Sequence, residues 1–215
     1  RKIVISTGAV TTVAGTGSSG SANGTGTSAS FNFPYRITTD GTNLYVGDGL
    51  NHQVRQIVIS TGVVTTVAGT GDNGSSNGTG TAASFYEPQG ITTDGTNLYV
   101  AGNKTNLIRK IVISTGVVTT VAGTGSIGSA NGTGTSASFY YPVGITTDGT
   151  NLYVADLGSD RIRQIVISTG AVTTVAGTGS TGSTNNSTGT SASFNYPYGI
   201  TTDGTNLYVA DSINN

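Results

Sequence analysis

The sequence predicts an all-β fold made of four copies of one structural unit. Three observations support this prediction. The segment RKIVISTG at the start of the chain returns as VRQIVISTG, IRKIVISTG and IRQIVISTG. Its arginines, Arg1, Arg55, Arg109 and Arg163, are separated by 54 residues three times in succession, as in a repeat protein. The repeated segments are rich in Ile, Val, Tyr and Thr, which favour strands, and their apolar residues lack helical spacing.

Each unit reads as four short strands. In one unit these strands are expected at residues 144–148, 151–156, 163–167 and 171–177. The first two are joined through Asp-Gly-Thr-Asn and the last two through Ser-Thr-Gly. Asp and Gly suit these turns because both tolerate the positive φ angles of tight hairpins. Four antiparallel strands repeated around an axis form the blades of a β-propeller, so this is the predicted fold.

The repeats start near residues 1, 55, 109 and 163. We therefore expect residues 1–215 to form a single β-propeller domain, or a four-blade segment of a longer repeat array. The chain opens with the third and fourth strands of a unit and closes with the first and second. The two termini are therefore able to share one blade, and such closure would remove exposed strand edges. A closed ring of four blades and a part of a larger array or ring both remain open.

Two segments carry a resemblance to a known family. FNYPYGITTDGTNLYVADSINN and YPVGITTDGTNLYVADLGSDRIRQIVI resemble the NHL repeat, and the resemblance covers essentially the whole chain. It implies a β-propeller of NHL-like repeats. The chain departs from the pattern at three positions: Arg36 stands where the other units have glycine, Gly47 replaces alanine, and Gly102 replaces aspartate.

Charge and residue content exclude several classes of function. Nine Lys and Arg against ten Asp and Glu give a net charge of −1, which argues against a nucleic-acid partner. No apolar run approaches the roughly 20 residues that span a bilayer, so membrane insertion is not expected. The chain has no cysteine, and His52 is its single histidine, whereas a zinc site needs about three or four N or S ligands. We therefore expect no metal, no cofactor and no catalytic residues, and predict that the chain is not an enzyme.

One face of the predicted propeller differs among the four units. The loops that lead into each first strand, and those between second and third strands, lie on this face, whereas the hairpin turns of the other face are nearly invariant. Six of the ten tyrosines lie on the variable face, and tyrosine is common at binding surfaces. Greater tolerance of long loops to change is the alternative explanation. The predicted ligand-binding residues are Phe33, Tyr35, Arg36, His52, Tyr86, Glu87, Gln89, Lys104, Tyr140, Tyr141, Asp160, Tyr196 and Tyr198.

These observations predict a non-enzymatic extracellular NHL-type propeller that acts as a scaffold. Its tyrosine-rich face would bind a protein, peptide or glycan. The alternative is a structural protein of a cell surface or fibre that assembles with itself, because near-identical units present uniform surfaces that stack. A propeller lyase or lactonase is a remote alternative, since those enzymes that resemble this family depend on several histidines and acidic residues.

Acceptor sequences in the linkers between units, together with the composition of the chain, predict that the protein is secreted. Asn23, Asn77 and Asn131 begin Asn-Gly-Thr and Asn186 begins Asn-Ser-Thr, which are acceptor sequences for N-glycosylation. The abundance of Thr, Ser, Gly and Asn, with few Lys and Glu, is typical of secreted repeat proteins. We therefore expect a secreted protein, extracellular or at a cell surface, with these four asparagines as candidate glycosylation sites.

Overall fold

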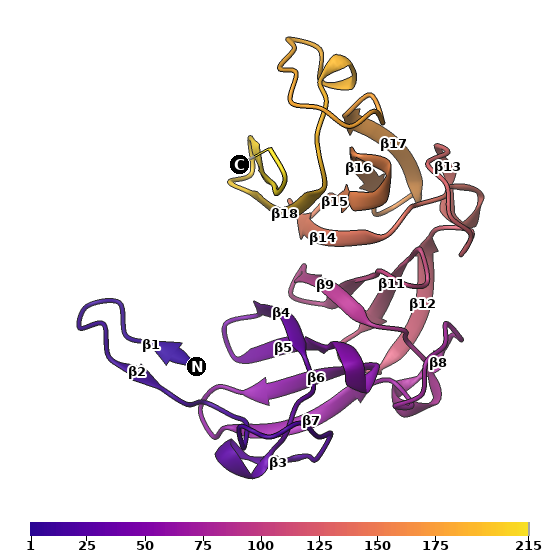
Figure 1. Cartoon of the computed structure of the whole chain (residues 1–215). Coiled ribbons are helices and arrows are strands. Elements are labelled where there is room, and N and C mark those ends of the chain that lie inside the picture. The colour runs from indigo at the N-terminus through magenta and orange to yellow at the C-terminus, as the bar shows by residue number, and fades with distance from the viewer. Residues whose placement is uncertain (215) are drawn as a thin grey trace.

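The computed structural model describes residues 1–214, so Asn215, the last residue of the predicted domain, lies outside the described residues. Three five-stranded and two two-stranded antiparallel sheets follow one another along the chain. Figure 1 shows them fanned around an axis as the blades of a propeller. The predicted all-β fold is confirmed, and its arrangement is that of a β-propeller.

The three complete blades have the same strand order from the axis outward. Blade 1 consists of β4 (Pro34–Thr39), β5 (Asn43–Asp48), β6 (Gln53–Val58), β7 (Val63–Ala68) and β3 (Gly24–Thr25). Blade 2 consists of β9 (Pro88–Thr93), β10 (Asn97–Gly102), β11 (Leu107–Val112), β12 (Val117–Ala122) and β8 (Gly78–Thr79). Blade 3 consists of β14 (Pro142–Thr147), β15 (Asn151–Asp156), β16 (Arg161–Val166), β17 (Ala171–Ala176) and β13 (Gly132–Thr133).

The glycine-rich linkers between blades form a fifth strand that the sequence analysis did not predict. The linker after blade 1 pairs antiparallel with the outer strand of blade 2, where Gly78 lies opposite Val118 and Thr79 opposite Val117. The linker then turns back on itself. A Cβ atom at Gly78 would lie 2.8 Å from the carbonyl oxygen of Ala82, so this close approach requires glycine. The linkers also carry the short 3₁₀ helices η1 (Gly26–Ser28), η3 (Gly80–Ala82), η4 (Gly134–Ser136) and η6 (Gly189–Ser191).

The hydrophobic core lies between neighbouring blades. Leu152 and Val154, on the second strand of blade 3, are fully buried in one cluster with Tyr99 and Ile108 of blade 2 and with Phe139 of the linker. A similar cluster joins blades 1 and 2. Blades 2 and 3 are therefore covered on both faces, which explains why their second strands read as continuous apolar runs, whereas Ile37 of blade 1 is 58% exposed.

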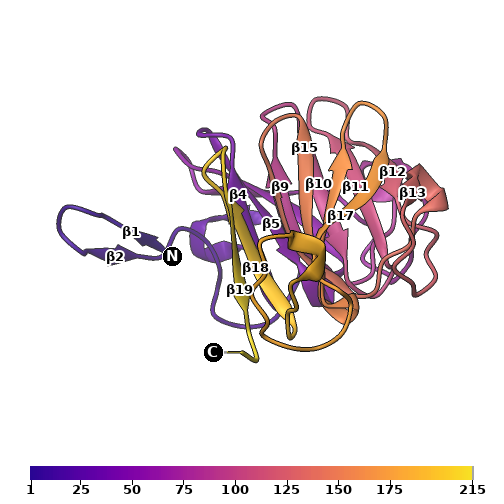
Figure 2. The ribbon, with the colours of Figure 1, turned by 90° about the horizontal axis from the view of Figure 1, so that it is seen from above.

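The two ends of the chain differ from the expectation. The N-terminal strands β1 (Lys2–Ile3) and β2 (Val10–Thr11) form one two-stranded sheet, and β18 (Pro197–Thr202) and β19 (Leu207–Asp211) form another. Among residues 1–214 these two sheets do not pair, so the predicted shared blade is not formed. Figures 1 and 2 show the reason: the blades make an open arc, and the N-terminal hairpin extends away from it. As a result, Ile3 is 63% exposed, whereas the equivalent Ile111 and Ile165 are fully buried.

The hairpin turns between first and second strands are built around one aspartate each. In blade 3 the carboxylate of Asp148 accepts hydrogen bonds from the N–H groups of Thr150 and Asn151 at 2.8 and 2.6 Å. Its other oxygen accepts the Asn151 amide at 3.0 Å and the Tyr153 hydroxyl at 2.9 Å. Asp40, Asp94 and Asp203 make equivalent contacts. The repeated aspartates therefore fix the turns as predicted, but through their side-chain oxygens, since the positive φ angles of these turns are at the glycines that follow them.

These contacts make the turn sensitive to acid. Burial alone would raise the pKa of the Asp148 carboxyl, but the hydrogen bonds from Asn151, Thr150 and Tyr153 outweigh it and lower the pKa to about 2. A carboxyl whose pKa is lower in the folded than in the unfolded state, roughly 3.9, stabilises the fold above that unfolded value. This stability is lost as the pH falls through about 2.

The variant Asp148→Asn tests this contribution. We expect it to lower the free energy of unfolding at pH 7 by less than about 1 kcal/mol, because the turn is exposed to solvent. The difference from the wild type should shrink toward zero at pH 2, where the native carboxyl is itself becoming neutral. Urea unfolding of both proteins at pH 7, 4 and 2 measures it, and an equal difference at all three values would contradict this assignment.

Candidate binding face

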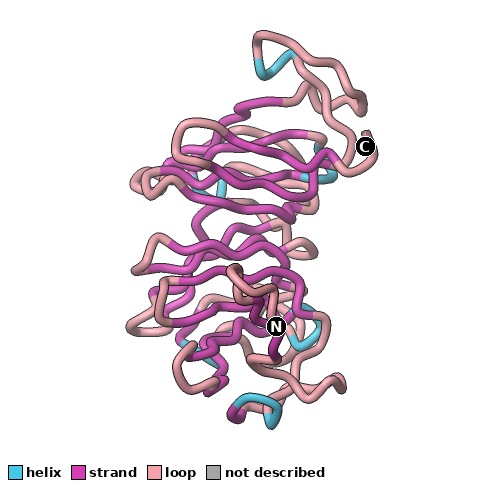
Figure 3. Tube along the Cα trace, turned by 90° about the vertical axis from the view of Figure 1, so that its left-hand side faces the viewer, coloured by secondary structure: helices cyan, strands magenta, loops and turns pink. Residues whose placement is uncertain are grey.

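One edge of the blades carries the loops that the sequence singled out, and we call it the loop face. It contains the lead-in loops, which precede the inner strands β4, β9, β14 and β18, and the loops between second and third strands. Figure 3 shows loops gathered at the edges of the stacked strands. The two kinds of loop are hydrogen-bonded within a blade: the Gly158 N–H donates to the Tyr140 carbonyl at 2.7 Å, and the Gly49 N–H donates to the Phe33 carbonyl at 3.1 Å. Two of the second-to-third loops contain 3₁₀ turns, η2 (Gly49–Asn51) and η5 (Leu157–Ser159).

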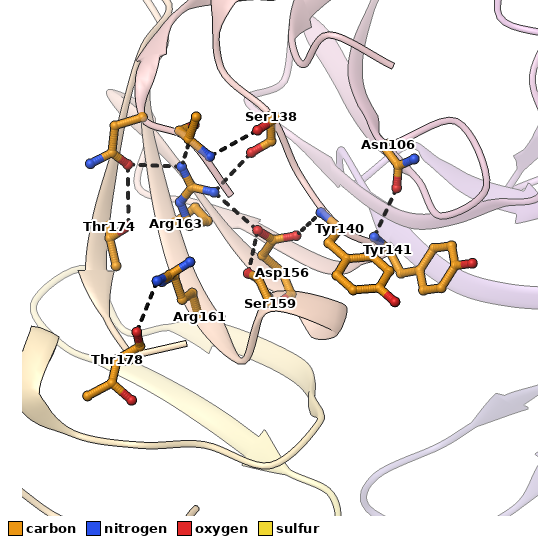
Figure 4. Close-up of polar contacts among 12 residues, drawn as sticks. Asn106, Ser138, Tyr140, Tyr141, Asp156, Ser159, Arg161, Arg163, Thr174 and Thr178 are labelled. Carbon is orange, nitrogen blue, oxygen red and sulfur yellow. Dashed lines mark hydrogen bonds and ion pairs between the residues drawn. The ribbon is translucent and has the colours of Figure 1, made fainter. Parts of the chain in front are cut away.

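A buried arginine supports these loops from beneath. In blade 3 the Arg163 guanidinium donates to the Asp156 carboxylate at 3.1 Å and to the Ser138 carbonyl at 3.1 Å (Figure 4). Its second terminal nitrogen donates to the Ala130 carbonyl at 3.0 Å and to the Asn131 side-chain oxygen at 2.9 Å. The arginine therefore joins the third strand to the end of the second strand and to the linker.

The Asp156 carboxylate extends this network to the lead-in loop. Its Oδ1 accepts the Tyr140 N–H at 2.7 Å, while the Ser159 hydroxyl donates at 2.6 Å to Oδ2, the oxygen that also accepts from Arg163 (Figure 4). Burial raises the pKa of the Asp156 carboxyl to about 6, while the bonds from Ser159, Tyr140 and Arg163 act in the opposite direction. The carboxyl is therefore ionised at neutral pH and pairs with the arginine. Arg55 and Asp48 form the same pair in blade 1 at 2.9 Å.

Neighbouring blades are joined through one residue in each second-to-third loop. His52, Asn106 and Asp160 occupy the same position in successive blades, and all three have positive φ angles of 50° to 55°. The side chain of each accepts a hydrogen bond from a lead-in N–H of the next blade. The pairs are Glu87 N–H to His52 Nδ1 at 3.2 Å, Tyr141 N–H to Asn106 Oδ1 at 3.0 Å and Tyr196 N–H to Asp160 Oδ1 at 2.9 Å.

Two of the predicted ligand-binding residues, His52 and Asp160, thus accept hydrogen bonds that join neighbouring blades. His52 is half-buried, and Asp160 is 8% exposed with its second oxygen accepting the Thr181 hydroxyl at 2.9 Å. This role was not predicted from the sequence. The available signal was a His, Asn or Asp at the same offset in three units, since each can accept a hydrogen bond and Asn and Asp tolerate a left-handed backbone.

Four predicted residues from three blades form an axial cluster: Tyr35, Arg36, Glu87 and Tyr198. The Arg36 guanidinium donates to the Tyr198 carbonyl at 2.7 Å and lies 4.8 Å from the centre of the Tyr198 ring. Burial raises the pKa of the Tyr35 hydroxyl, and the nearby Glu87 and Tyr198 raise it further. Arg36 therefore links the first complete blade to the last pair of strands, and polar and aromatic groups gather beside it.

Arg36, in place of the glycine of the other units, and Gly47, in place of alanine, have one common structural explanation. In blade 3 the inner strand packs so closely against the next one that a Cβ atom at Gly144 would lie 2.7 Å from the Tyr198 carbonyl oxygen. In blade 1 the close approach is made instead by Gly47, where a Cβ atom would lie 2.6 Å from the Pro88 carbonyl oxygen. The small residue has thus moved from the first strand to the second. A long side chain is thereby tolerated at Arg36.

The remaining predicted residues form smaller aromatic groups. The rings of Tyr140 and Tyr141 are 4.8 Å apart, and the Lys104 ammonium lies 5.5 Å from the centre of the Tyr141 ring. Tyr86 makes an edge contact with His52 at 5.4 Å, and Phe33 lies 6.5 Å from Tyr35. Gln89, on the inner strand of blade 2, is half-buried, and its side-chain oxygen has no hydrogen-bond partner within residues 1–214. The structure thus distributes the predicted residues over several clusters along the arc.

The candidate glycosylation residues lie on the linkers and not on the loop face. The side-chain oxygens of Asn23, Asn77 and Asn131 accept hydrogen bonds from the buried arginines of their blades at 2.8, 2.9 and 2.9 Å. Asn186 accepts the Thr188 N–H at 3.0 Å. The first three asparagines therefore have a structural role, and their modification stays a prediction.

Other features of the described chain bear on function. Hollows of about 220 and 520 Å³ lie on the flank of blade 1, and the smaller one reaches Tyr35 and Arg36. Within residues 1–214 no three His, Cys, Asp or Glu side chains are grouped so that they could hold a metal ion. The helices in this part of the chain are too short to cross a membrane.

Comparison with known proteins supports the resemblance noted above. No family model matches the chain. Human NHL repeat-containing protein 2 is 28% identical over 252 aligned residues, which cover 100% of this chain and 35% of that protein. The resemblance of this chain to NHL-repeat proteins is confirmed. The chain spans about a third of the length of this NHL-repeat relative.

Solved structures show the same fold. A Bacteroides thetaiotaomicron protein of unknown function has a TM-score of 0.66 and 25% identity, with 81% of this chain and 44% of that chain covered. An auxiliary nutrient binding protein from Bacteroides ovatus has a TM-score of 0.61 and 21% identity, with the same coverage of 81% and 44%. The NHL-like repeats of this chain therefore have the architecture of solved propeller structures.

Replacing His52 by Asn, the residue that blade 2 uses at the equivalent position, tests the bond between blades. Asparagine keeps a side-chain acceptor for the Glu87 N–H, as Asn106 does for Tyr141 in the next pair of blades, whereas alanine removes it. We expect His52→Ala to lower the free energy of unfolding by roughly 1 kcal/mol more than His52→Asn. Urea unfolding of the wild type and both variants at neutral pH measures this difference. Equal losses in the two variants would show that His52 Nδ1 is not an acceptor in solution.

Proposed function

We propose that this chain is a non-enzymatic binding scaffold whose loop face holds a protein, peptide or glycan. The observation that carries the proposal is the presentation of aromatic side chains at fixed backbone positions. Phe33 and Tyr196 occupy equivalent lead-in positions with φ angles of 52° and 60°, and they are 61% and 48% exposed. Large aromatic side chains that remain exposed on an ordered backbone are typical of binding surfaces.

The loops are held in place before any partner arrives. The Tyr196 N–H is bonded to Asp160 and its carbonyl accepts the Ser212 N–H at 3.2 Å. The Tyr141 N–H is bonded to Asn106 in the same manner. A positive φ angle at a residue other than glycine costs about 1–3 kcal/mol and persists only where surrounding contacts enforce it. Such ordering lowers the entropy cost of binding, which favours recognition by this face.

The chemistry of the face supports binding without catalysis. It carries one histidine, and the Nδ1 of that residue already accepts a hydrogen bond from the next blade. The Asp160 carboxylate accepts two hydrogen bonds and is buried. The propeller fold also serves an auxiliary nutrient binding protein, although a fold alone does not transfer a ligand. Within residues 1–214 no three His, Cys, Asp or Glu side chains come together, which does not favour the lyase or lactonase alternative.

The same proposal includes the organisation and location of the protein. We propose that residues 1–215 act as one propeller unit or as part of a longer array, and that the unit is extracellular or at a cell surface. The low charge content and the linker asparagines support this location. The structural alternative, in which near-identical blades assemble with one another, is distinguished from binding by the experiment below.

The double variant Tyr141→Ala and Tyr196→Ala tests the proposal. We expect the wild type to be retained on peptide or glycan arrays and the double variant to be retained at least about tenfold less. The reason is that tyrosines are frequent hot spots, each worth about 1–2 kcal/mol or more of binding free energy. Tyr208→Ala is the matched control: this tyrosine is also exposed, and its hydroxyl donates to Asp203 in a hairpin turn. The control should retain its binding.

Two other outcomes would contradict the proposal. If Tyr208→Ala loses as much retention as the double variant, the loop face is not the binding surface. If array binding is unchanged in the double variant and sedimentation shows that the wild type self-associates through these tyrosines, the structural alternative is correct. Thermal unfolding of all three proteins confirms that each variant is folded.

A further inference from the structure

In three of the four units the second strand ends at an aspartate, and its carboxylate accepts hydrogen bonds from equivalent donors. Asp48, Asp156 and Asp211 each accept a lead-in N–H at 2.7 Å, from Asn32, Tyr140 and Asn195 respectively. In blades 1 and 3 the same carboxylates pair with Arg55 and Arg163. A side chain from the following loop adds a further donor, which is Asn51 in blade 1 at 2.8 Å and Ser159 in blade 3 at 2.6 Å.

Blade 2 keeps these donors but has glycine at position 102 in place of the aspartate. Arg109 is 1% exposed, and within residues 1–214 it forms no ion pair. The nitrogen that meets the carboxylate in the other blades, Nη1, donates here only to the Ser84 carbonyl, at a long 3.3 Å. The Tyr86 N–H, equivalent to the N–H groups of Asn32 and Tyr140, has no acceptor in the described part of the chain.

A third donor comes from Thr105, which is equivalent to Asn51 and Ser159. A Cβ atom added to Gly102 would meet the Thr105 hydroxyl oxygen, so this hydroxyl lies where the aspartate side chain would begin. Its present acceptor is the Gly102 carbonyl at 3.3 Å. In blade 3 the equivalent Ser159 hydroxyl donates to the Asp156 carboxylate, so rotation of the short Thr105 side chain would direct its proton to an anion at the same place.

We propose that blade 2 binds chloride where the other blades hold an aspartate carboxylate, with Arg109, the Tyr86 N–H and the Thr105 hydroxyl as its donors. A buried cation without a counter-charge is costly, and an anion at this point would supply the missing charge. Burial lowers the pKa of Arg109 to about 10, which still leaves the guanidinium charged at neutral pH. Within residues 1–214, the charged residues of the adjoining loops, Glu87 and Lys104, form no ion pair with it. The Thr105 hydroxyl lies where the aspartate side chain would begin, which favours a small anion over a large one.

The experiment compares salts at equal ionic strength. We expect the melting temperature of the wild type to be about 2–4 °C higher in 0.5 M sodium chloride than in sodium gluconate, whose anion is too large for this position. The variant Gly102→Asp with Thr105→Ser reproduces blade 3 and supplies its own carboxylate. It should melt at the same temperature in both salts and above the wild type in gluconate.

An equal salt response in the wild type and the variant would overturn the proposal, because the effect would then arise elsewhere. If the variant does not fold, crystals of the wild type grown in sodium bromide decide the question. An anomalous bromide peak beside Arg109 and the Tyr86 N–H supports the site, and its absence refutes it. These outcomes do not depend on whether the loop face binds a partner.

Discussion

The structure depends on a buried guanidinium in the third strand of each complete blade. Arg55, Arg109 and Arg163 each donate to two linker carbonyls and to a linker asparagine, and each lies about 5.3 Å from a phenylalanine ring. The linkers consist largely of Gly, Ser, Thr and Asn, and each complete blade's linker buries one alanine and packs one phenylalanine against the core, such as Ala137 and Phe139. The rest of each linker is therefore ordered mainly by hydrogen bonds to the arginine and to the outer strand. A buried arginine must have such partners, because leaving it unpaired would cost several kcal/mol.

Order at the loop face follows from this anchoring. The arginine holds the aspartate at the end of the second strand, the aspartate holds a lead-in N–H, and the next lead-in N–H is held by the preceding blade. Exposed rings such as Tyr196 are thus presented on a backbone whose bonds reach the buried core. Variation among the four units is concentrated where side chains project from this frame. The hairpin turns of the other face are closed by their own aspartates and vary little.

Local patterns in the sequence predicted the strands, the tight turns and the repeat period, because these depend on residues close together in the chain. The fifth strand could not be predicted, since it is only two residues long, Gly78 and Thr79, and lies in a run of Gly, Ser, Thr and Asn without apolar alternation. Arg163 was recognised as a repeat marker only, because arginines are mostly exposed and its partners lie far away in the sequence. His52 was assigned to the ligand-binding face, but its acceptor role depends on contact with the next blade. The strand order allowed the termini to share one blade, but this blade is not formed, because strand order does not fix the curvature of the arc.

The free energy of unfolding of the variant Arg163→Met tests the central role of the arginine most directly. Methionine keeps much of the side-chain volume but leaves Asp156 buried without its partner and removes the donor for Ala130 and Asn131. The account predicts a loss of about 3–5 kcal/mol, together with faster amide hydrogen exchange in the linker that contains β13. A loss below about 1 kcal/mol with unchanged protection of that linker would show that the arginine does not order it.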